Sequence, residues 1–171
     1  MLRQLKQHHQ PNDSHNKVSR AEIRFSLRFE LRVMNKKVTI TSKARLSDGA
    51  IKELRLDVSL DIQRELWQIQ LNNFDENVIR FREADLYRAM QALREYLEAK
   101  GCQLLCAGAR PDVAPSGMSR SMGGGREAYV LHLGKQATEL VDIFDYAAPA
   151  FVGTVQKQRE YFQAWMASLR A

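Results

Sequence analysis

The chain has 171 residues, of which 44% are hydrophobic and 27% charged, an ordinary composition for a folded domain that argues against wholesale disorder. No apolar run approaches the roughly 18 residues of a membrane span. The two cysteines cannot build a disulfide scaffold. The first residues lack the continuous apolar segment of a signal peptide, so we expect a soluble, cytoplasmic protein that does not bind membranes.

The net charge of +6 is unevenly distributed. Residues 1–60 contain 13 Lys or Arg and 6 Asp or Glu, whereas residues 61–171 contain 13 and 14. A basic excess of this kind favours an acidic partner, whether nucleic acid, membrane or protein, or it keeps a polar face in water. Composition alone does not choose between these alternatives.

The chain divides into a short polar arm and one folded domain. Residues 1–20 are polar without a sustained period, and we expect a flexible arm there, followed by a single α+β domain over residues 21–171. The arm contains His8, His9 and His15, but nothing gives them the fixed geometry of a metal site. We therefore expect neither a metal nor a cofactor.

Alternation of apolar and polar residues predicts a series of strands. The pattern is sharpest in the first of them, and turn residues separate the later ones at 35–37, 47–49 and 72–73. Short connections between successive strands predict an antiparallel meander with one apolar face and one face in water. The expected strands are Glu22–Val33, Val38–Ala44, Leu54–Ile62, Trp67–Leu71 and Val78–Phe81.

A helix over Glu83–Lys100 follows from apolar residues at helical spacing, with Gly101 as its cap. We expect it to cover the apolar face of the meander. Short strands are predicted over Cys102–Ala107 and Tyr129–Leu133, whereas Leu140–Tyr146 fits a strand or a helical turn.

Thr154 is a typical N-cap for a last helix. Five apolar residues fall on one side of that helix, which should therefore be its buried side. They are Val155, Phe162, Trp165, Met166 and Leu169.

The most unusual chemistry lies in residues 107–126, a 20-residue connection without a usable period. It contains five of the nine glycines, and loops of this length in compact domains are usually functional or disordered. Gly123-Gly124-Gly125 would let successive N–H groups point at one phosphate or carboxylate, with arginine and serine side chains as further donors. Neither a P-loop nor a dinucleotide-binding glycine motif is present.

The same loop also has the residue types of a protein-docking surface, because methionine is an adaptable apolar contact and arginine is enriched at interfaces. The candidate partner-binding or anion-binding residues are Arg110, Asp112, Ser116, Met118, Ser119, Arg120, Met122, Gly123, Gly124, Gly125 and Arg126.

Catalytic patterns are sparse. We expect Cys102 and Cys106 to be buried, unreactive thiols, too far apart along one strand to bridge. A Cys106–His132 nucleophile would require paired strands on either side of the loop. Asp142 and Asp145 are more typical of the polar side of an element than of an acid–base pair. We therefore assign no catalytic residues, and an enzyme stays a lesser alternative.

A basic sheet face is a third functional alternative. Arg24, Arg28 and Arg32 share one face of the first expected strand and would follow a nucleic-acid backbone. However, Glu30 lies on the same face, and Phe29 faces the apolar side instead of offering a ring for base stacking. We do not expect nucleic acid to be the partner.

The C-terminal part of the chain contains a distinctive series of short motifs: RPD (110–112), PSGMSR (115–120), MGGG (122–125), AYVL (128–131), GK (134–135) and VDIFD (141–145). They resemble a module of small bacterial proteins from polymorphic toxin loci, which encode immunity proteins. The resemblance covers about the last 60 residues. It implies a non-catalytic protein that binds and neutralises a cognate toxin. Since the charge of +6 departs from the acidic balance usual for inhibitors of basic nucleases, the class of toxin is not assigned.

The sequence thus predicts an α+β domain in which a long helix packs on an antiparallel meander, with a smaller strand pair and a C-terminal helix. The preferred function is an immunity-type protein-binding module. The alternative is a phosphate- or nucleotide-type small-ligand protein, or an enzyme, that uses the glycine- and arginine-rich loop over 107–126.

Overall fold

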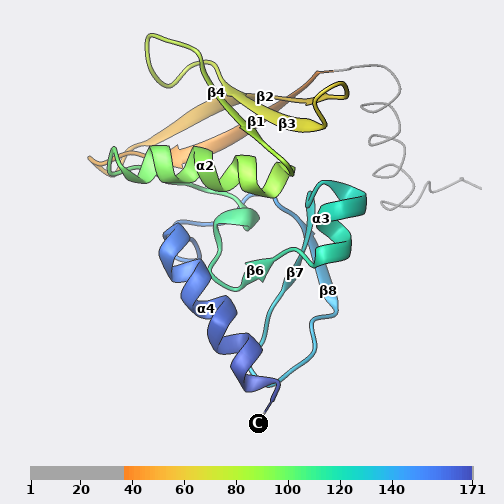
Figure 1. Cartoon of the computed structure of the whole chain (residues 1–171). Helices are drawn as coiled ribbons and strands as arrows, with labels where there is room; N and C mark the ends of the chain where they lie inside the picture. The colour runs from red at the N-terminus through yellow and green to blue at the C-terminus, as the bar shows by residue number, and fades with distance from the viewer. Residues whose placement is uncertain (1–36, 171) are drawn as a thin grey trace, which may run out of the picture.

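Residues 37–170, which the computed structural model describes, form two antiparallel sheets and three α-helices (Figure 1). The α+β fold expected from the sequence is confirmed. The expected arm over residues 1–20 and the expected strand over Glu22–Val33 lie outside the described residues.

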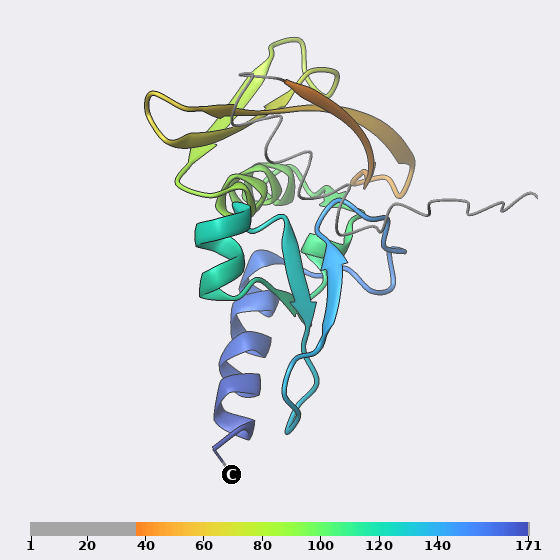
Figure 2. The same cartoon turned by 90° about the vertical axis from the view of Figure 1, so that its right-hand side faces the viewer.

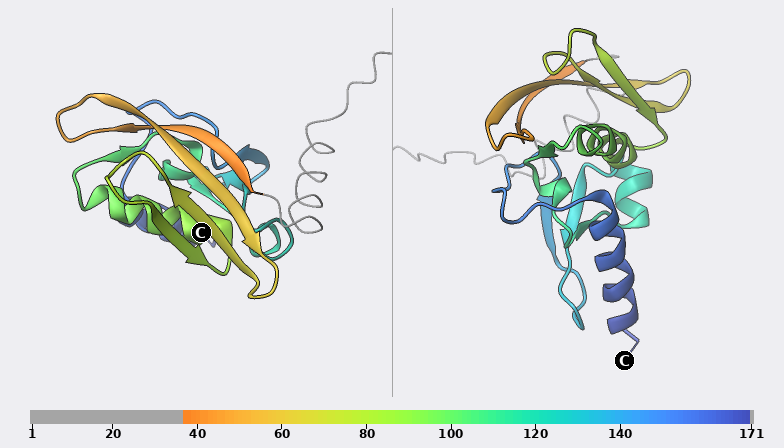
Figure 3. Two further views of the ribbon diagram at one scale, coloured as in Figure 1. Left: turned by 90° about the horizontal axis from the view of Figure 1, so that it is seen from above. Right: turned by 90° about the vertical axis from the view of Figure 1, so that its left-hand side faces the viewer.

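The larger sheet has the order β4-β3-β2-β1-β5 and arches over one long helix (Figure 3). Sequential strands pair antiparallel, with Ile40 opposite Leu56 and Leu56 opposite Leu71, so the apolar residues share the face toward the helix. The predicted meander is therefore confirmed over its described strands. They are β1 (Val38–Arg45), β2 (Ile51–Asp61), β3 (Leu66–Leu71) and β4 (Ile79–Glu83). Strand β5 (Gln103–Leu104) comes later in the chain and pairs with β1 at the edge of the sheet.

Helix α2 (Leu86–Glu98) lies across the apolar face of this sheet, as predicted (Figure 1). Its first free N–H groups are capped by Asp85, whose side chain accepts a hydrogen bond from the Arg88 amide at 2.8 Å. Gly101 ends the helical turn with a φ of 72°, in the left-handed region that favours glycine. Leu93 and Met90 are fully buried between helix and sheet.

The second half of the chain consists of short elements below α2. In chain order these are the 3-10 helix η1 (Ala107–Ala109), β6 (Val113–Ala114), α3 (Gly117–Gly123), β7 (Glu127–Val130), β8 (Glu139–Asp142) and α4 (Val155–Ser168). Strands β6, β7 and β8 form the smaller sheet in that order.

Two expectations about this half are wrong. The connection over 107–126, expected as one long loop, contains η1, β6 and α3. The strand expected over Cys102–Ala107 is reduced to β5, because the chain turns into η1 where the amides of Ala107 and Gly108 donate to the carbonyls of Asp145 and Ile143. Strand β7 begins two residues before the expected Tyr129–Leu133 and ends at Val130.

Helix α4 begins as predicted, with the Thr154 side chain accepting from the Lys157 amide at 3.2 Å. Its expected apolar side is buried only at Val155, because the second half of the helix extends away from the larger sheet beside the hairpin that joins β7 and β8 (Figure 2). Polar bonds hold it there: Tyr161 donates to the Leu131 carbonyl at 3.1 Å and Trp165 to the Lys135 carbonyl at 3.0 Å.

Candidate binding site around α3

Helix α3 is a single short helix with a defined beginning and end. The Ser116 side chain accepts a hydrogen bond from the Ser119 amide at 3.1 Å, and Gly124 ends the helix with a φ of 64°. Met118 and Met122 lie four residues apart and therefore on one side of α3, where they are 72% and 59% exposed. Both methionines are presented to solvent.

The glycines after α3 allow close packing of this segment against the larger sheet and α2. A Cβ at Gly124 would lie 2.6 Å from the Trp67 ring, and one at Gly125 would lie 2.9 Å from the Cβ of Tyr87. The Gly124 carbonyl also accepts hydrogen bonds from the amides of Leu86 and Tyr87, the first residues of α2. Glycine is required here by contact as well as by backbone conformation.

The amides of the glycine segment are used within the chain. Those of Gly124 and Gly125 both point back to the Ser119 carbonyl, and the Arg126 amide donates to the Gly123 carbonyl at 3.4 Å. The N–H groups that the sequence offered for binding an anion therefore already donate to backbone carbonyls at the end of α3. An anion at this site would have to be held by side chains.

The three arginines of the candidate set do not converge, because each pairs with a different aspartate. Arg110 bonds to Asp112 through two nitrogens, at 2.6 and 2.9 Å. Arg120 bonds to Asp85 at 2.7 and 2.9 Å. Arg126 bonds to Asp142 at 2.8 Å. The pairs of Arg120 and Arg126 tie the segment to the rest of the fold, whereas the Arg110–Asp112 pair lies within the segment.

The serines of the set also have structural partners. Ser116 caps α3, and the Ser119 hydroxyl donates to the Glu127 carbonyl at the start of β7. Among the candidate residues, Met118 and Met122 are thus the large side chains that the fold leaves exposed. The structure separates the set into an anchored framework and an apolar pair on its outer side.

A buried polar network between α2, η1 and α4, which the sequence did not predict, holds the start of the 107–126 segment. Arg94 of α2 is 1% exposed and donates to the carbonyls of Gly108 at 3.0 Å and Gly153 at 2.9 Å, and to the Gln158 side chain at 2.5 Å. Gln158 of α4 in turn donates to the carbonyls of Gly108, Arg110 and Val113. Burial lowers the pKa of Arg94, and these acceptors replace the water it has lost.

The position of Arg94 was a signal of this role. It lies four residues after Met90 and three before Leu97, so it occupies the apolar side of α2. A charged residue at such a position must find buried partners.

The Cys106–His132 alternative receives no support from the geometry. Cys106 is fully buried, its thiol donates to the Met90 sulfur at 3.6 Å, and burial raises its pKa to about 12. Its strand partner is Tyr146, whereas β7 pairs with β6 and β8, so Cys106 and His132 are not on paired strands. Within residues 37–170 no group of three His, Cys, Asp or Glu side chains is placed to hold a metal ion.

The basic residues of the sheet's outer face have partners of their own. Arg80 and Arg82 donate to Gln70 and Gln68 across β4 and β3, at 3.1 and 2.7 Å. Lys37 pairs with Asp57 at 2.7 Å. Of these three residues only Lys37 is paired with an acidic side chain of the described residues, so Arg80 and Arg82 keep their charges on the outer face.

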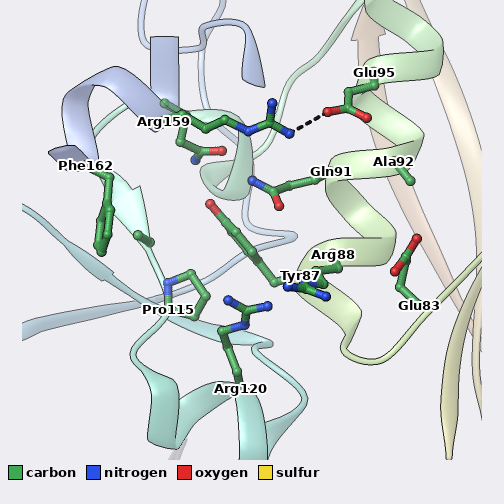
Figure 4. Close-up of a pocket in the computed structure, with 12 residues that line it drawn as sticks. Glu83, Tyr87, Arg88, Gln91, Ala92, Glu95, Pro115, Arg120, Arg159 and Phe162 are labelled. Carbon is green, nitrogen blue, oxygen red and sulfur yellow. Dashed lines mark hydrogen bonds and ion pairs between the residues drawn. The ribbon is translucent and has the colours of Figure 1, made fainter. Parts of the chain in front are cut away.

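A cavity of about 500 Å³ lies beside α3, between α2, the segment at Ala114 and Pro115, and α4 (Figure 4). Arg120 of α3 lines it, so the cavity and the methionine pair are separated by one helix.

No helix in the part of the chain that the structure describes is long and apolar enough to cross a membrane. No protein-family model matches this sequence, and no curated protein matches it significantly, so the function has to be argued from the site itself.

Proposed function

We propose that the chain is a non-catalytic protein-binding module whose partner contacts α3 through Met118 and Met122. The observation that carries this proposal is the exposure of both methionines, 72% and 59%, on a helix that the fold holds at both ends. Methionine side chains adapt to irregular surfaces and are enriched at interfaces.

The way α3 is anchored supports a binding role. The cap at Ser116, the Arg120–Asp85 pair and the contact of Gly124 with Trp67 fix the helix before any partner arrives. A surface fixed in advance loses little conformational entropy on binding, so more of the contact energy is kept as affinity.

The immunity-type assignment comes from the resemblance of the C-terminal motifs. The motifs over 115–120 and 122–125 are the residues that build, cap and present α3. If the module has the same use in this chain, the partner is a cognate toxin and binding neutralises it.

The proposal is tested by tagged capture from the organism that encodes the chain. We expect one stoichiometric protein partner, and we expect the double variant Met118→Ser/Met122→Ser to lower its recovery at least tenfold, since central apolar anchors dominate interfaces. The control is Ile62→Ser/Val78→Ser, which changes two exposed apolar residues, 42% and 43%, in connections between strands of the larger sheet. Capture equal for the two double variants would contradict the assignment to α3.

The toxin role needs a separate measurement. The captured partner is expressed alone and together with the chain, and growth is compared. We expect growth arrest by the partner alone, rescue by the wild-type chain and little rescue by the α3 double variant. A partner that does not impair growth would refute the immunity role while leaving the binding module intact.

Methionine variants test this surface better than arginine variants. Replacing Arg120 or Arg126 also leaves Asp85 or Asp142 without its cation, and a loss of binding would then include a loss of structure.

A further inference from the structure

The cavity beside α3 joins three elements that are far apart in the sequence. Figure 4 shows side chains from α2, from the segment before α3 and from α4 facing one another around it. Its volume of about 500 Å³ lies in the range of sites that hold a small ligand or a few side chains of a partner.

One side of the cavity is apolar. Phe162 of α4 and Pro115 stand on this side in Figure 4, whereas Ala92 of α2 lies across the cavity from Phe162. Phe162 is 39% exposed although it is a large apolar side chain. This wall fits an aliphatic or aromatic group.

The cavity is also rich in hydrogen-bond donors. Arg120 uses two nitrogens on one oxygen of Asp85, and Arg159 uses one on Glu95, which leaves each guanidinium with further N–H groups. The Arg88 guanidinium forms neither a hydrogen bond nor an ion pair with residues 37–170. The carboxylates at the cavity are Glu95, bonded to Arg159, and Glu83, which lies on the side away from Phe162 in Figure 4.

The cavity thus has two glutamates and three arginines, and one of these arginines, Arg88, has no side-chain partner in the described chain. Its chemistry complements a group that is both apolar and negatively charged. We propose that the cavity receives an acidic segment of the protein partner, in which an apolar side chain packs on Phe162 and a neighbouring carboxylate binds Arg88 and Arg120. This inference rests on the proposed function and adds the chemistry of the partner.

The position of α3 favours a protein segment over a free metabolite. Met118 and Met122 lie on the outer side of α3, and Arg120, two residues from each, lines the cavity on its inner side. A helix with its side chains is about 10–12 Å across, so a partner that packs on the methionines needs only a few residues to reach the cavity.

The first test compares charge reversals in the capture experiment. Arg88→Glu reverses the charge at the cavity, and Arg55→Glu makes the same change on the outer face of the larger sheet. Both arginines are exposed, so both variants should keep the melting temperature of the wild type. We expect Arg88→Glu to lower partner recovery at least tenfold and Arg55→Glu to change it less than twofold.

The second test uses a defined probe on the full chain. Backbone amide shifts are followed by NMR while acetyl-Gly-Phe-Asp-Glu-Gly-amide is added, and then with the matched peptide in which Asn and Gln replace Asp and Glu. We expect the acidic peptide to shift amides at Gln91 and Phe162, and we expect neither the neutral peptide nor the Arg88→Glu variant to reproduce the shifts. Equal shifts with both peptides would overturn the proposal.

The outcomes separate this inference from the proposed function. Loss of capture by the methionine variant together with full capture by Arg88→Glu would refute the cavity and leave the binding module standing. Full capture by both variants would refute both. Shifts with free 3-phenylpropanoate that require Arg88, combined with full capture by Arg88→Glu, would identify a small-molecule site and overturn the assignment to a partner segment.

Discussion

The larger sheet with α2 and the segment from residue 102 onward are stabilised in different ways. In the first region, fully buried residues such as Leu54, Leu56 and Ile69 alternate along strands and meet the apolar side of one helix. In the second, β5 and β6 have two residues each, η1 has three and α3 has seven. Arg94, Gln158 and three Arg–Asp pairs join these short pieces.

The comparison shows that one helix, α2, can take part in both kinds of stabilisation, apolar burial and buried hydrogen bonds. Apolar burial is non-directional and spread over many residues, so its periodic pattern is visible in the sequence. Hydrogen bonds to carbonyls are directional, and a few side chains carry them. Leu93 and Arg94 are neighbours on α2, yet Leu93 belongs to the apolar core and Arg94 to the polar network.

The substitution expected to have the largest effect on the second region relative to the first is Arg94→Met, which keeps much of the side-chain volume but removes every hydrogen-bond donor. The carbonyls of Gly108 and Gly153 would lose a buried partner. We expect the free energy of unfolding to fall by about 3–5 kcal/mol, measured by urea denaturation.

Amide hydrogen exchange then shows which elements of the variant lose stability. We expect amides of residues 107–113 and of α4 to lose protection while β1–β3 keep theirs. The control is Leu93→Ala, which should cost about 2–5 kcal/mol and weaken the sheet itself. Equal loss of protection in sheet and α4 with Arg94→Met would show that the two regions unfold as one unit.

The next largest effect should come from Gly124→Ala. The added Cβ would stand 2.6 Å from the Trp67 ring on a backbone with a φ of 64°. We expect a loss of about 2–3 kcal/mol by thermal or urea unfolding, together with weaker partner capture, because α3 would move from the sheet.

Gly117→Ala is the matched control, since nothing lies within 4 Å of a Cβ at that position and its φ is ordinary. It should change stability by less than about 0.5 kcal/mol. A Gly124→Ala variant as stable as this control would show that α3 is not held by contact with Trp67.

Much of the first region could be predicted from the sequence. Strands β1, β3 and β4 and the position of α2 follow from period-two and helical spacing. In the second region the cap of α4 at Thr154 could also be predicted. The interior of the 107–126 segment could not, because elements of two or three residues are too short to establish a period. They form where the rest of the fold offers hydrogen-bond partners. The Ile143 carbonyl, for example, accepts a hydrogen bond from the Gly108 amide of η1.

The geometry of the candidate residues could not be predicted from the sequence. The sequence singled out the arginines and glycines, yet spacing along a loop does not tell which aspartate each arginine will meet. Asp85 lies 35 residues before Arg120, and Asp142 lies 16 after Arg126. The function assigned to these residues stays a prediction until the capture experiments are done.

A smaller effect is expected from an acidic group within the sheet. Burial alone would raise the pKa of Asp57, but hydrogen bonds from Lys37, Thr39 and Asn72 outweigh it and lower the pKa to about 2. Ionised Asp57 therefore stabilises the fold above the unfolded value of 3.8, and this contribution is lost as the pH falls toward 2.

We expect Asp57→Asn to cost about 1–2 kcal/mol at neutral pH, because Lys37 is half-exposed and its attraction is screened. The difference in unfolding free energy between wild type and variant, measured from pH 6 to pH 2, should shrink below about pH 4. A difference that stays constant over this range would contradict the lowered pKa.

The smallest effect should come from Arg159 and Glu95, which also join α4 to α2, at 2.8 Å. Both side chains are more than half exposed, so water competes for them and salt screens them, and Arg159→Ala should cost less than about 0.5 kcal/mol. A double-mutant cycle with Glu95→Ala, repeated in 1 M salt, isolates the pair. A coupling energy as large as the loss expected for Arg94→Met would mean that this exposed ion pair is a major connection between the two helices. A value near zero would mean that the buried carbonyl contacts of Arg94 and Gln158 make the connection.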